Sequence, residues 1–343
     1  MSFAGVREPD KVGSSPPSSP AMASSAFARL ASRIPWAYAA RRVLAAIPTM
    51  LAIITIAFFM VRAAPGNPWS AERKLPPQIE ANLKASMGLD KPLHQQYFEY
   101  VGKVVTGDLG PSLRNKDKSV AELIGEGLPV SLTIGALAIS TAIFFGVGLG
   151  VIAAVRQNSP ADYGTMGLAM IGISIPTFVT GPLLSLVFGL WLGWFAVAGL
   201  DLGQMNVYNL TLPVITLALP QIAIISRLMR ASMIEVLRSN YIRTARAKGL
   251  SERRILMRHA VPAAILPVVS YLGPAIVGVI TGSVVVERVF GLPGIGQSFI
   301  DGAMTRDYTR VMGTVILYGG LIIVFNLIAD ILYAVLAPKV RYE

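Results

Sequence analysis

The most informative segment of this chain reads Arg243-Thr244-Ala245-Arg246-Ala247-Lys248-Gly249 and, after nine further residues, His259-Ala260-Val261-Pro262. It is a short basic segment between two long apolar runs. Lys and Arg gather on the cytoplasmic side of membrane proteins, so this segment is expected to face the cytosol. A basic segment held there by apolar helices on both sides is well placed to bind a cytosolic protein.

Apolar segments dominate the rest of the chain. Of its 343 residues, 53% are hydrophobic and only 14% are charged, whereas about 25% are charged in soluble domains. Each of six runs without Asp, Glu, Lys or Arg can supply the roughly 17 to 25 residues that cross a bilayer core. These runs are 43–61, 127–155, 163–200, 202–226, 260–286 and 311–329. The sequence predicts an all-α, polytopic membrane protein with six transmembrane helices.

The net charge of +11 indicates topology rather than binding to nucleic acid. Lys and Arg are concentrated in the N-terminal tail and in residues 227–262, while residues 191–211 contain none. The positive-inside rule therefore predicts that both termini and the basic loop are cytoplasmic. Anionic lipid headgroups are the expected neighbours of this charge.

The predicted order of segments follows from these runs. A Ser- and Pro-rich stretch opens the chain and has too little apolar surface to order itself. The segments are a disordered cytoplasmic tail (1–28), a basic segment with the first transmembrane helix (29–61), an extracytoplasmic segment (62–128), and a core of five transmembrane helices (129–343) with a cytoplasmic loop at 235–262.

The spans themselves are predicted at 43–61, 129–155, 212–233, 263–286 and 311–336, with one more between residues 163 and 200. That uncharged stretch could hold two spans, but two would place the basic loop outside. We therefore predict one helix, broken or kinked near Pro176 and Pro182, and then an interfacial stretch that contains Trp191, Trp194 and Phe195.

Local propensities predict two helices joined by a glycine turn within the loop. Residues 241–248 include strong helix formers, and Gly249 follows where a left-handed residue ends a helix. Ser251 is then a suitable N-cap for a second helix over 252–260. A plain basic loop lying on lipid phosphates is the alternative. The small residues expected to face a partner are Ala245, Ala247 and Gly249.

This loop resembles the EAA loop of binding-protein-dependent ABC importer permeases, in which a helix–Gly–helix unit docks onto an ATPase. The family pattern is Glu-Ala-Ala, three residues, Gly, nine residues, and an apolar-x-apolar-Pro ending. Arg243 and Thr244 replace the Glu and the first Ala, and His259 occupies an apolar position. Such replacements are typical of the peptide branch of the family. The positions in register are Ala245, Gly249, Val261 and Pro262.

Other segments resemble the same branch over roughly residues 38–343. Three of them are similar to dipeptide, oligopeptide and nickel permeases: Arg41-Arg42, residues 62–68, and residues 287–296 followed by Arg306-Asp307-Tyr308. Residues 72–77 continue without a large insertion, which is most similar to the B-type subunit of oligopeptide permeases.

The resemblance implies a multi-pass permease of the bacterial inner membrane that imports oligopeptides. Its implied partners are a second homologous permease subunit (forming a heterodimer), two cytoplasmic ABC ATPases that bind ATP and Mg, and an extracytoplasmic peptide-binding protein. Permeases for dipeptides or nickel are the alternatives within the family. The residues it assigns to ATPase coupling are Arg243, Thr244, Ala245, Ala247, Gly249, Leu250 and Ser251. The candidates for the outer loop or gate are Glu287, Phe290, Pro293, Gly294, Gly296, Asp307 and Tyr308. A purely structural turn is the alternative for Pro293, Gly294 and Gly296, and an interhelical contact is the alternative for Glu287.

The sequence lacks the motifs of an ATPase or a metalloenzyme. It contains no Gly-x-x-x-x-Gly-Lys-[Ser/Thr] loop to cradle phosphates, no cysteine, and only two histidines, which are far apart. We therefore expect no catalytic residue, metal or cofactor in this chain. A self-contained secondary transporter is the alternative from another class, and it would need ionisable relay groups inside its spans. The predicted spans hold only Arg227, Arg230 and Asp330.

Overall fold

The computed structural model describes residues 36–63, 78, 85, 88, 90–115, 117–199 and 206–336. The predicted tail (1–28) lies outside these residues, as does much of the segment between α2 and α4. The described helices are α2 (Trp36–Ala63), α4 (Leu93–Val105), α5 (Val120–Val155), α6 (Pro160–Ser174), α7 (Thr177–Leu184), α8 (Val207–Leu237), α9 (Asn240–Ala247), α10 (Glu252–Ile255), α11 (Val261–Ala264), α12 (Leu266–Phe290), α13 (Ile295–Met304) and α14 (Tyr308–Leu336), with π-helical turns at Ser185–Trp191 and Leu256–Ala260.

Among the described residues, five helices are long and apolar enough to cross a membrane, and a sixth span is available from a bent pair. The pair is Pro160–Ser174 and Thr177–Trp191, which meet at 107°. The break falls at Ile175, whose extended backbone (φ −100°, ψ 121°) is what a residue before proline adopts. The all-α class and the break near Pro176 are therefore confirmed, while Pro182 lies inside α7 without ending it.

The second span begins earlier than predicted. The sequence predicts a start at residue 129, whereas α5 begins at Val120. A capping box explains the difference: Ser119 Oγ accepts from the Glu122 N–H at 3.2 Å, and Glu122 Oε2 accepts from the Ser119 N–H at 2.8 Å. Helix α5 therefore begins within the segment 62–128 that the sequence predicts to be extracytoplasmic.

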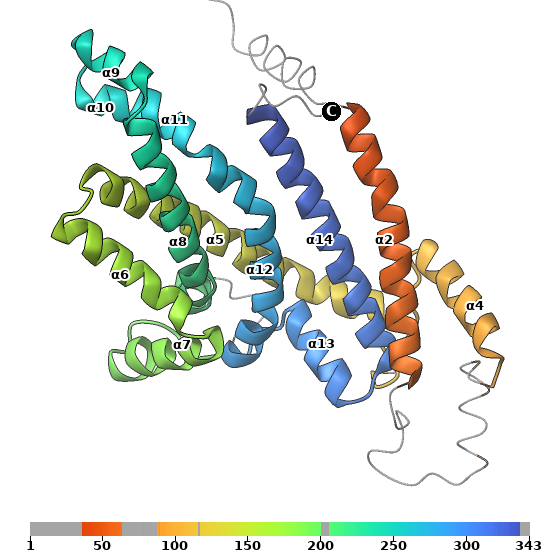
Figure 1. Ribbon diagram of the computed structural model, residues 1–343. Helices are drawn as coiled ribbons and strands as arrows, with labels where there is room; N and C mark the ends of the chain where they lie inside the picture. The colour runs from red at the N-terminus through yellow and green to blue at the C-terminus, as the bar shows by residue number, and fades with distance from the viewer. Residues whose placement is uncertain are drawn as a thin grey trace, which may run out of the picture.

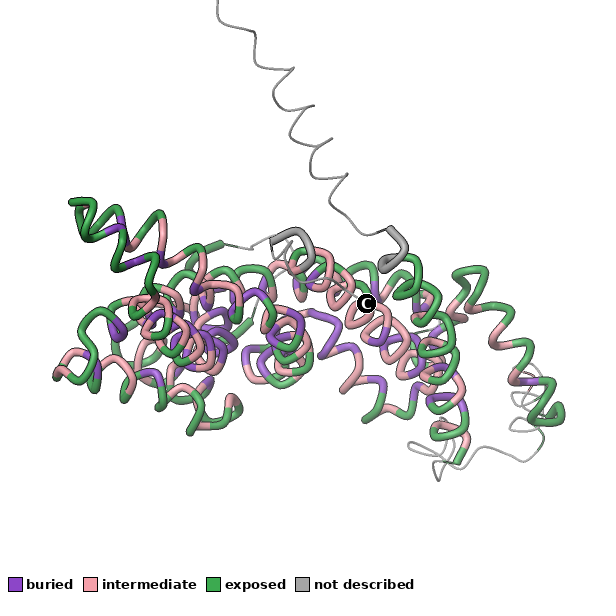
Figure 2. The backbone as a smooth tube through the Cα atoms, turned by 45° about the horizontal axis from the view of Figure 1, so that its top comes forward, coloured by how far each residue is buried: buried purple, intermediate pink, exposed green. Residues whose placement is uncertain are grey.

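The buried core gathers around α8. Ile225 and Met229 on α8 are fully buried, as is Ile134 on α5, and they belong to one apolar cluster that also includes residues of α12. Figure 2 shows the buried positions running through the middle of the molecule, with exposed positions on the outward sides of the helices. Exposed apolar side chains are expected on helices whose outer sides face lipid.

Different helices lie at the two ends of the molecule (Figure 1). Helices α9 and α10 lie at one end, together with the first turns of α2 and the last turns of α14, while α7 and α13 lie toward the other. Arg42 on α2 and Asp330 on α14 form an ion pair at 2.9 Å. Asp330 is thus an interhelical partner, as its position near a membrane end suggests.

Candidate functional site

The first candidate site is a hairpin made of α9, the turn after it and α10. Gly249 has φ +73°, so the predicted left-handed residue is confirmed. The Gly249 N–H donates to the Arg246 carbonyl at 2.9 Å, and the Leu250 N–H donates to the Ala245 carbonyl at 3.3 Å. These two bonds form a Schellman motif, which satisfies carbonyls at the end of α9 and reverses the chain.

An ion pair crosses the turn of the hairpin. Arg246 Nε donates to Glu252 Oε1 at 2.8 Å, and Arg246 Nη2 donates to Glu252 Oε2 at 3.3 Å. The hydrogen bond from Arg246 lowers the pKa of the Glu252 carboxyl, so the pair is ionised at neutral pH. The sequence analysis missed this pair, because a spacing of six residues carries no signal until the glycine turn brings the two helices together.

The hairpin buries one face and exposes the other. Ile242 and Ala245 on α9 and Ile255 on α10 are buried against the rest of the chain. The prediction that Ala245 faces a partner is therefore wrong, because Ala245 lies three residues from Ile242 and shares its helix face. The other predicted residues remain accessible: Arg243, Thr244, Ala247, Gly249 and Ser251 are exposed, and Leu250 is half-buried.

The second helix of the hairpin reaches residue 260, as predicted, but it is not α-helical throughout. Ser251 precedes α10, as predicted, but its side chain makes no capping hydrogen bond. The α-helix ends at Ile255 and continues as a π-helical turn over Leu256–Ala260 instead of remaining α-helical to residue 260. Ala260 is fully buried, so this turn packs the base of the hairpin against the core.

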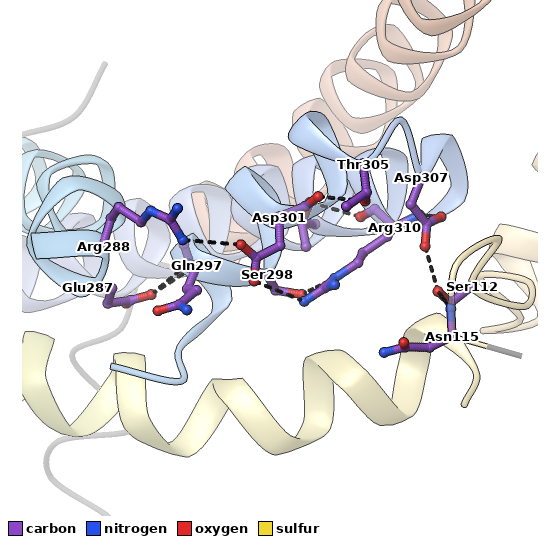
Figure 3. Close-up of polar contacts among 12 residues, drawn as sticks. Ser112, Asn115, Glu287, Arg288, Gln297, Ser298, Asp301, Thr305, Asp307 and Arg310 are labelled. Carbon is purple, nitrogen blue, oxygen red and sulfur yellow. Dashed lines mark hydrogen bonds and ion pairs between the residues drawn. The ribbon is translucent and has the colours of Figure 1, made fainter. Parts of the chain in front are cut away.

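The second candidate site lies around α13, where the sequence placed the gate candidates. Glu287, at the end of α12, is fully buried and accepts three hydrogen bonds. The donors are Ser131 Oγ (2.7 Å), the Gly296 N–H (2.7 Å) and the Gln297 N–H (3.3 Å). The last two belong to the first turn of α13 (Figure 3), so Glu287 provides the acceptors that an N-cap side chain normally supplies.

Gly294 makes this arrangement possible. It occupies the N-cap position of α13 and has no side chain to cap the helix. A Cβ there would lie 2.7 Å from Ser131 Oγ, which is closer than real Cβ contacts. Phe290 is buried beside this turn, Gly296 is buried and Pro293 is half-buried. These residues therefore form a packed joint between α12, α13 and α5.

The Asp307 carboxylate binds the first turn of α14 and the segment before α5. It is fully buried and accepts from Ser112 Oγ, from Thr309 Oγ1 at 2.9 Å and from the Arg310 N–H at 3.1 Å. Arg310 Nε in turn donates to Ser298 Oγ on α13 at 2.8 Å. Figure 3 shows Glu287, Ser298, Arg310 and Asp307 following one another along α13. We call Glu287, Ser131, Ser298, Asp307, Arg310 and Ser112 the α13 network.

Tyr308, the remaining gate candidate, is not part of the α13 network. Tyr308 lines a cavity of about 370 Å³ that also borders Arg62 and Tyr100, between the ends of α2, α4 and α14.

The serines of the α13 network could not be predicted from the sequence, because a lone serine in a helix is commonplace. Within the described residues, no group of three or more His, Cys, Asp and Glu could hold a metal ion.

The chain matches two related family descriptions. Residues 146–342 match the binding-protein-dependent transport system inner membrane component, and residues 36–134 match the N-terminal part of such membrane components.

The alignments with curated relatives cover almost the full length of those proteins. The chain is 52% identical over 302 residues to the oligopeptide transport system permease protein OppB of Escherichia coli (strain K12), covering 88% of this chain and 98% of that protein. It is 39% identical over 304 residues to the dipeptide transport system permease protein DppB of Bacillus subtilis (strain 168), covering 89% of this chain and 97% of that protein.

A solved structure shares the fold. An inward-facing form of the MetNI methionine ABC transporter superposes with a TM-score of 0.53 at 17% identity, covering 62% of this chain and 96% of that one. At this identity the similarity concerns the helical arrangement alone.

Proposed function

This chain belongs to the binding-protein-dependent transport system inner membrane components, and we propose that it forms part of the pathway by which an ATP-driven importer moves oligopeptides into the bacterial cytoplasm. The observation that carries this proposal is the 52% identity to an oligopeptide permease over 98% of that protein. The identity to a dipeptide permease is lower, at 39%. Dipeptides are therefore the second candidate substrate.

We assign ATP hydrolysis to separate protein chains, because this sequence has no phosphate-binding loop and its hairpin offers a surface where ATPases can dock. The hairpin exposes Arg243, Thr244, Ala247 and Gly249 at one end of the molecule. In this proposal two separate ATPases bind there, hold ATP and Mg, and perform the hydrolysis. We assign the end with the hairpin to the cytoplasm because the basic hairpin lies there together with the first turns of α2, which carry Arg41 and Arg42.

Transport then proceeds by alternating access. A soluble binding protein delivers the peptide to the opposite end, near the α13 network and residues 90–119. Closure of the ATPases on ATP displaces the hairpin, and packed helices carry this movement as rigid bodies. A second, homologous permease subunit supplies the other half of the pathway.

A self-contained secondary transporter is less well supported. In the part of the chain that the structure describes, two buried carboxyl groups, Asp162 and Glu287, lie within helices, and a third, Asp307, directly precedes α14. A proton relay would need such groups free. Asp162 is held by Arg230 at 2.6 Å, and Glu287 holds the first turn of α13. Both groups therefore link helices to one another, Asp162 through an ion pair and Glu287 through hydrogen bonds.

The purified chain alone is expected neither to bind nor to hydrolyse ATP, because it has no loop to cradle phosphates. The measurement is phosphate release by the chain in detergent or lipid, compared with the complex that contains the ATPases. Hydrolysis by a preparation shown to be free of other chains would contradict the proposal.

Peptide length is tested by uptake in the native organism. Deleting the gene is expected to abolish uptake of a labelled tetrapeptide, and a plasmid copy should restore it, while dipeptide uptake remains. If the deletion abolishes only dipeptide uptake, the dipeptide candidate replaces the oligopeptide one.

A further inference from the structure

A partly buried ion pair joins α6 to α8, the helix that leads into the hairpin. Arg230 Nε and Nη2 donate to the two carboxylate oxygens of Asp162, each at 2.6 Å. Asp162 is only 1% exposed and also accepts from the Asn158 N–H at 2.9 Å. A pair bonded through two parallel hydrogen bonds fixes direction as well as distance. The start of α6 is therefore held in one orientation on α8.

Further contacts fix the rest of α6 to α8. A Cβ at Gly172, near the end of α6, would lie 2.7 Å from the Leu219 carbonyl oxygen, so the two backbones touch there. In the turn before α6, Gln157 Oε1 accepts from Arg238 Nη2 at 3.1 Å. Helix α6 is thus attached to α8 at both of its ends.

The end of α6 leads to the α13 network. After Ser174 the chain bends by 107° into α7, and α7 packs against α12. A Cβ at Gly181 on α7 would lie 3.3 Å from Phe290 Cε2, so α7 lies directly against Phe290. Phe290 is three residues from Glu287 on α12. The helices α8, α6 and α7 therefore form a continuous packed connection between the hairpin and the α13 network.

We propose that Asp162 and Arg230 are positioning residues for transport, which make α6 move with α8 so that displacement of the hairpin reaches α7. This inference rests on the proposed function, since the ATPases would supply the displacement. Stability alone explains the pair poorly, because the cost of removing the Asp162 carboxylate from water offsets part of its attraction to Arg230, whose side chain stays 28% exposed. Fixing the direction of one helix on another is what the bidentate geometry adds.

The test uses the complete transporter, with its native partner chains, in proteoliposomes. Asp162→Asn keeps the size of the side chain and removes its charge. We expect peptide uptake per ATP hydrolysed to fall by about two- to thirty-fold, while the ATPases stay bound and active. Arg227→Gln is the matched control, because Arg227 lies one turn away on α8 and is exposed. It should leave uptake per ATP unchanged.

A covalent replacement of the pair tests its role directly. The chain contains no cysteine, so Asp162→Cys with Arg230→Cys introduces the only two thiols of this subunit. Joining them with a short, reducible bis-thiosulfonate linker should restore uptake per ATP, and reduction should abolish it again.

Three results would overturn the inference. One is an Asp162→Asn complex that moves as much peptide per ATP as the parent. Another is a complex that fails to assemble or to hydrolyse ATP whether or not the linker is present, since the pair would then serve folding alone. The third is a linked form that transports no better than the reduced form. Failure of the parent complex to transport peptide with ATP is a separate outcome, which would refute the proposed function and this inference with it.

Discussion

Gly249→Val is expected to uncouple ATP hydrolysis from peptide uptake while the helices remain inserted. Gly249 has φ +73°, and a side chain in this region costs about 1 to 2 kcal/mol, with β-branched residues at the high end. A penalty of that size lowers the population of the docking-competent turn by about five- to thirty-fold. The measurement is uptake per ATP hydrolysed, together with the amount of ATPase that co-purifies.

Two further variants distinguish the effect of backbone conformation at the turn from the effects of charge and of side-chain size. A Cβ at Gly249 meets no atom of the described residues within 4 Å, its two chain neighbours aside, so the cost inside the chain comes from the backbone. Asn tolerates the left-handed region, and Gly249→Asn should therefore keep most of the uptake. Arg253→Ala removes one exposed charge and should matter less than the valine. A valine variant that assembles and transports like the parent would show that the hairpin does not couple to the ATPases.

Glu287→Ala is expected to destabilise the chain more than any other substitution in the α13 network. The alanine leaves three donors without their acceptor: Ser131 Oγ and the N–H groups of Gly296 and Gln297. Each unsatisfied buried donor costs about 1 to 3 kcal/mol, so a total loss of about 3 to 5 kcal/mol is expected. The measurement is thermal unfolding of the purified subunit in detergent, followed by uptake in the complex.

The control for this prediction is Asp301→Ala. Asp301 forms an ion pair with Arg288 at 3.3 Å, in which the side chains are 36% and 54% exposed, and a longer one with Arg310 at 4.0 Å. Surface pairs of this kind contribute about 0 to 1 kcal/mol. Glu287→Gln, which keeps one acceptor, should fall between the two. If Glu287→Ala unfolds at the same temperature as Asp301→Ala, Glu287 does not organise α13.

Features that depend on neighbouring residues were predictable from the sequence. The left-handed turn at Gly249 follows from helix formers on one side and an N-cap on the other. The break before Pro176 follows from the effect of proline on the preceding residue. The start of α5 was predicted too late, because Pro129 was taken as its first residue, although the capping box lies at Ser119.

Contacts between distant segments were not predictable in the same way. Glu287 and Ser131 are separated by 156 positions, and Asp307 and Ser112 by 195. Charge and hydropathy patterns do not indicate which helices become neighbours, so these hydrogen bonds could be identified only in the folded structure. The burial of Ala245 was missed for the same reason, since a small residue suits an exposed docking face as well as a close helix contact.

The most direct test of the account is tetrapeptide uptake by proteoliposomes that contain the complete transporter and its binding protein. The account predicts accumulation with enclosed ATP and Mg, and none with a non-hydrolysable ATP analogue or with ATPases whose phosphate-loop lysine is substituted. A proton or sodium gradient without ATP should drive no uptake. Accumulation driven by such a gradient, with this chain as the only protein present, would contradict the claim that separate ATPases power transport through it.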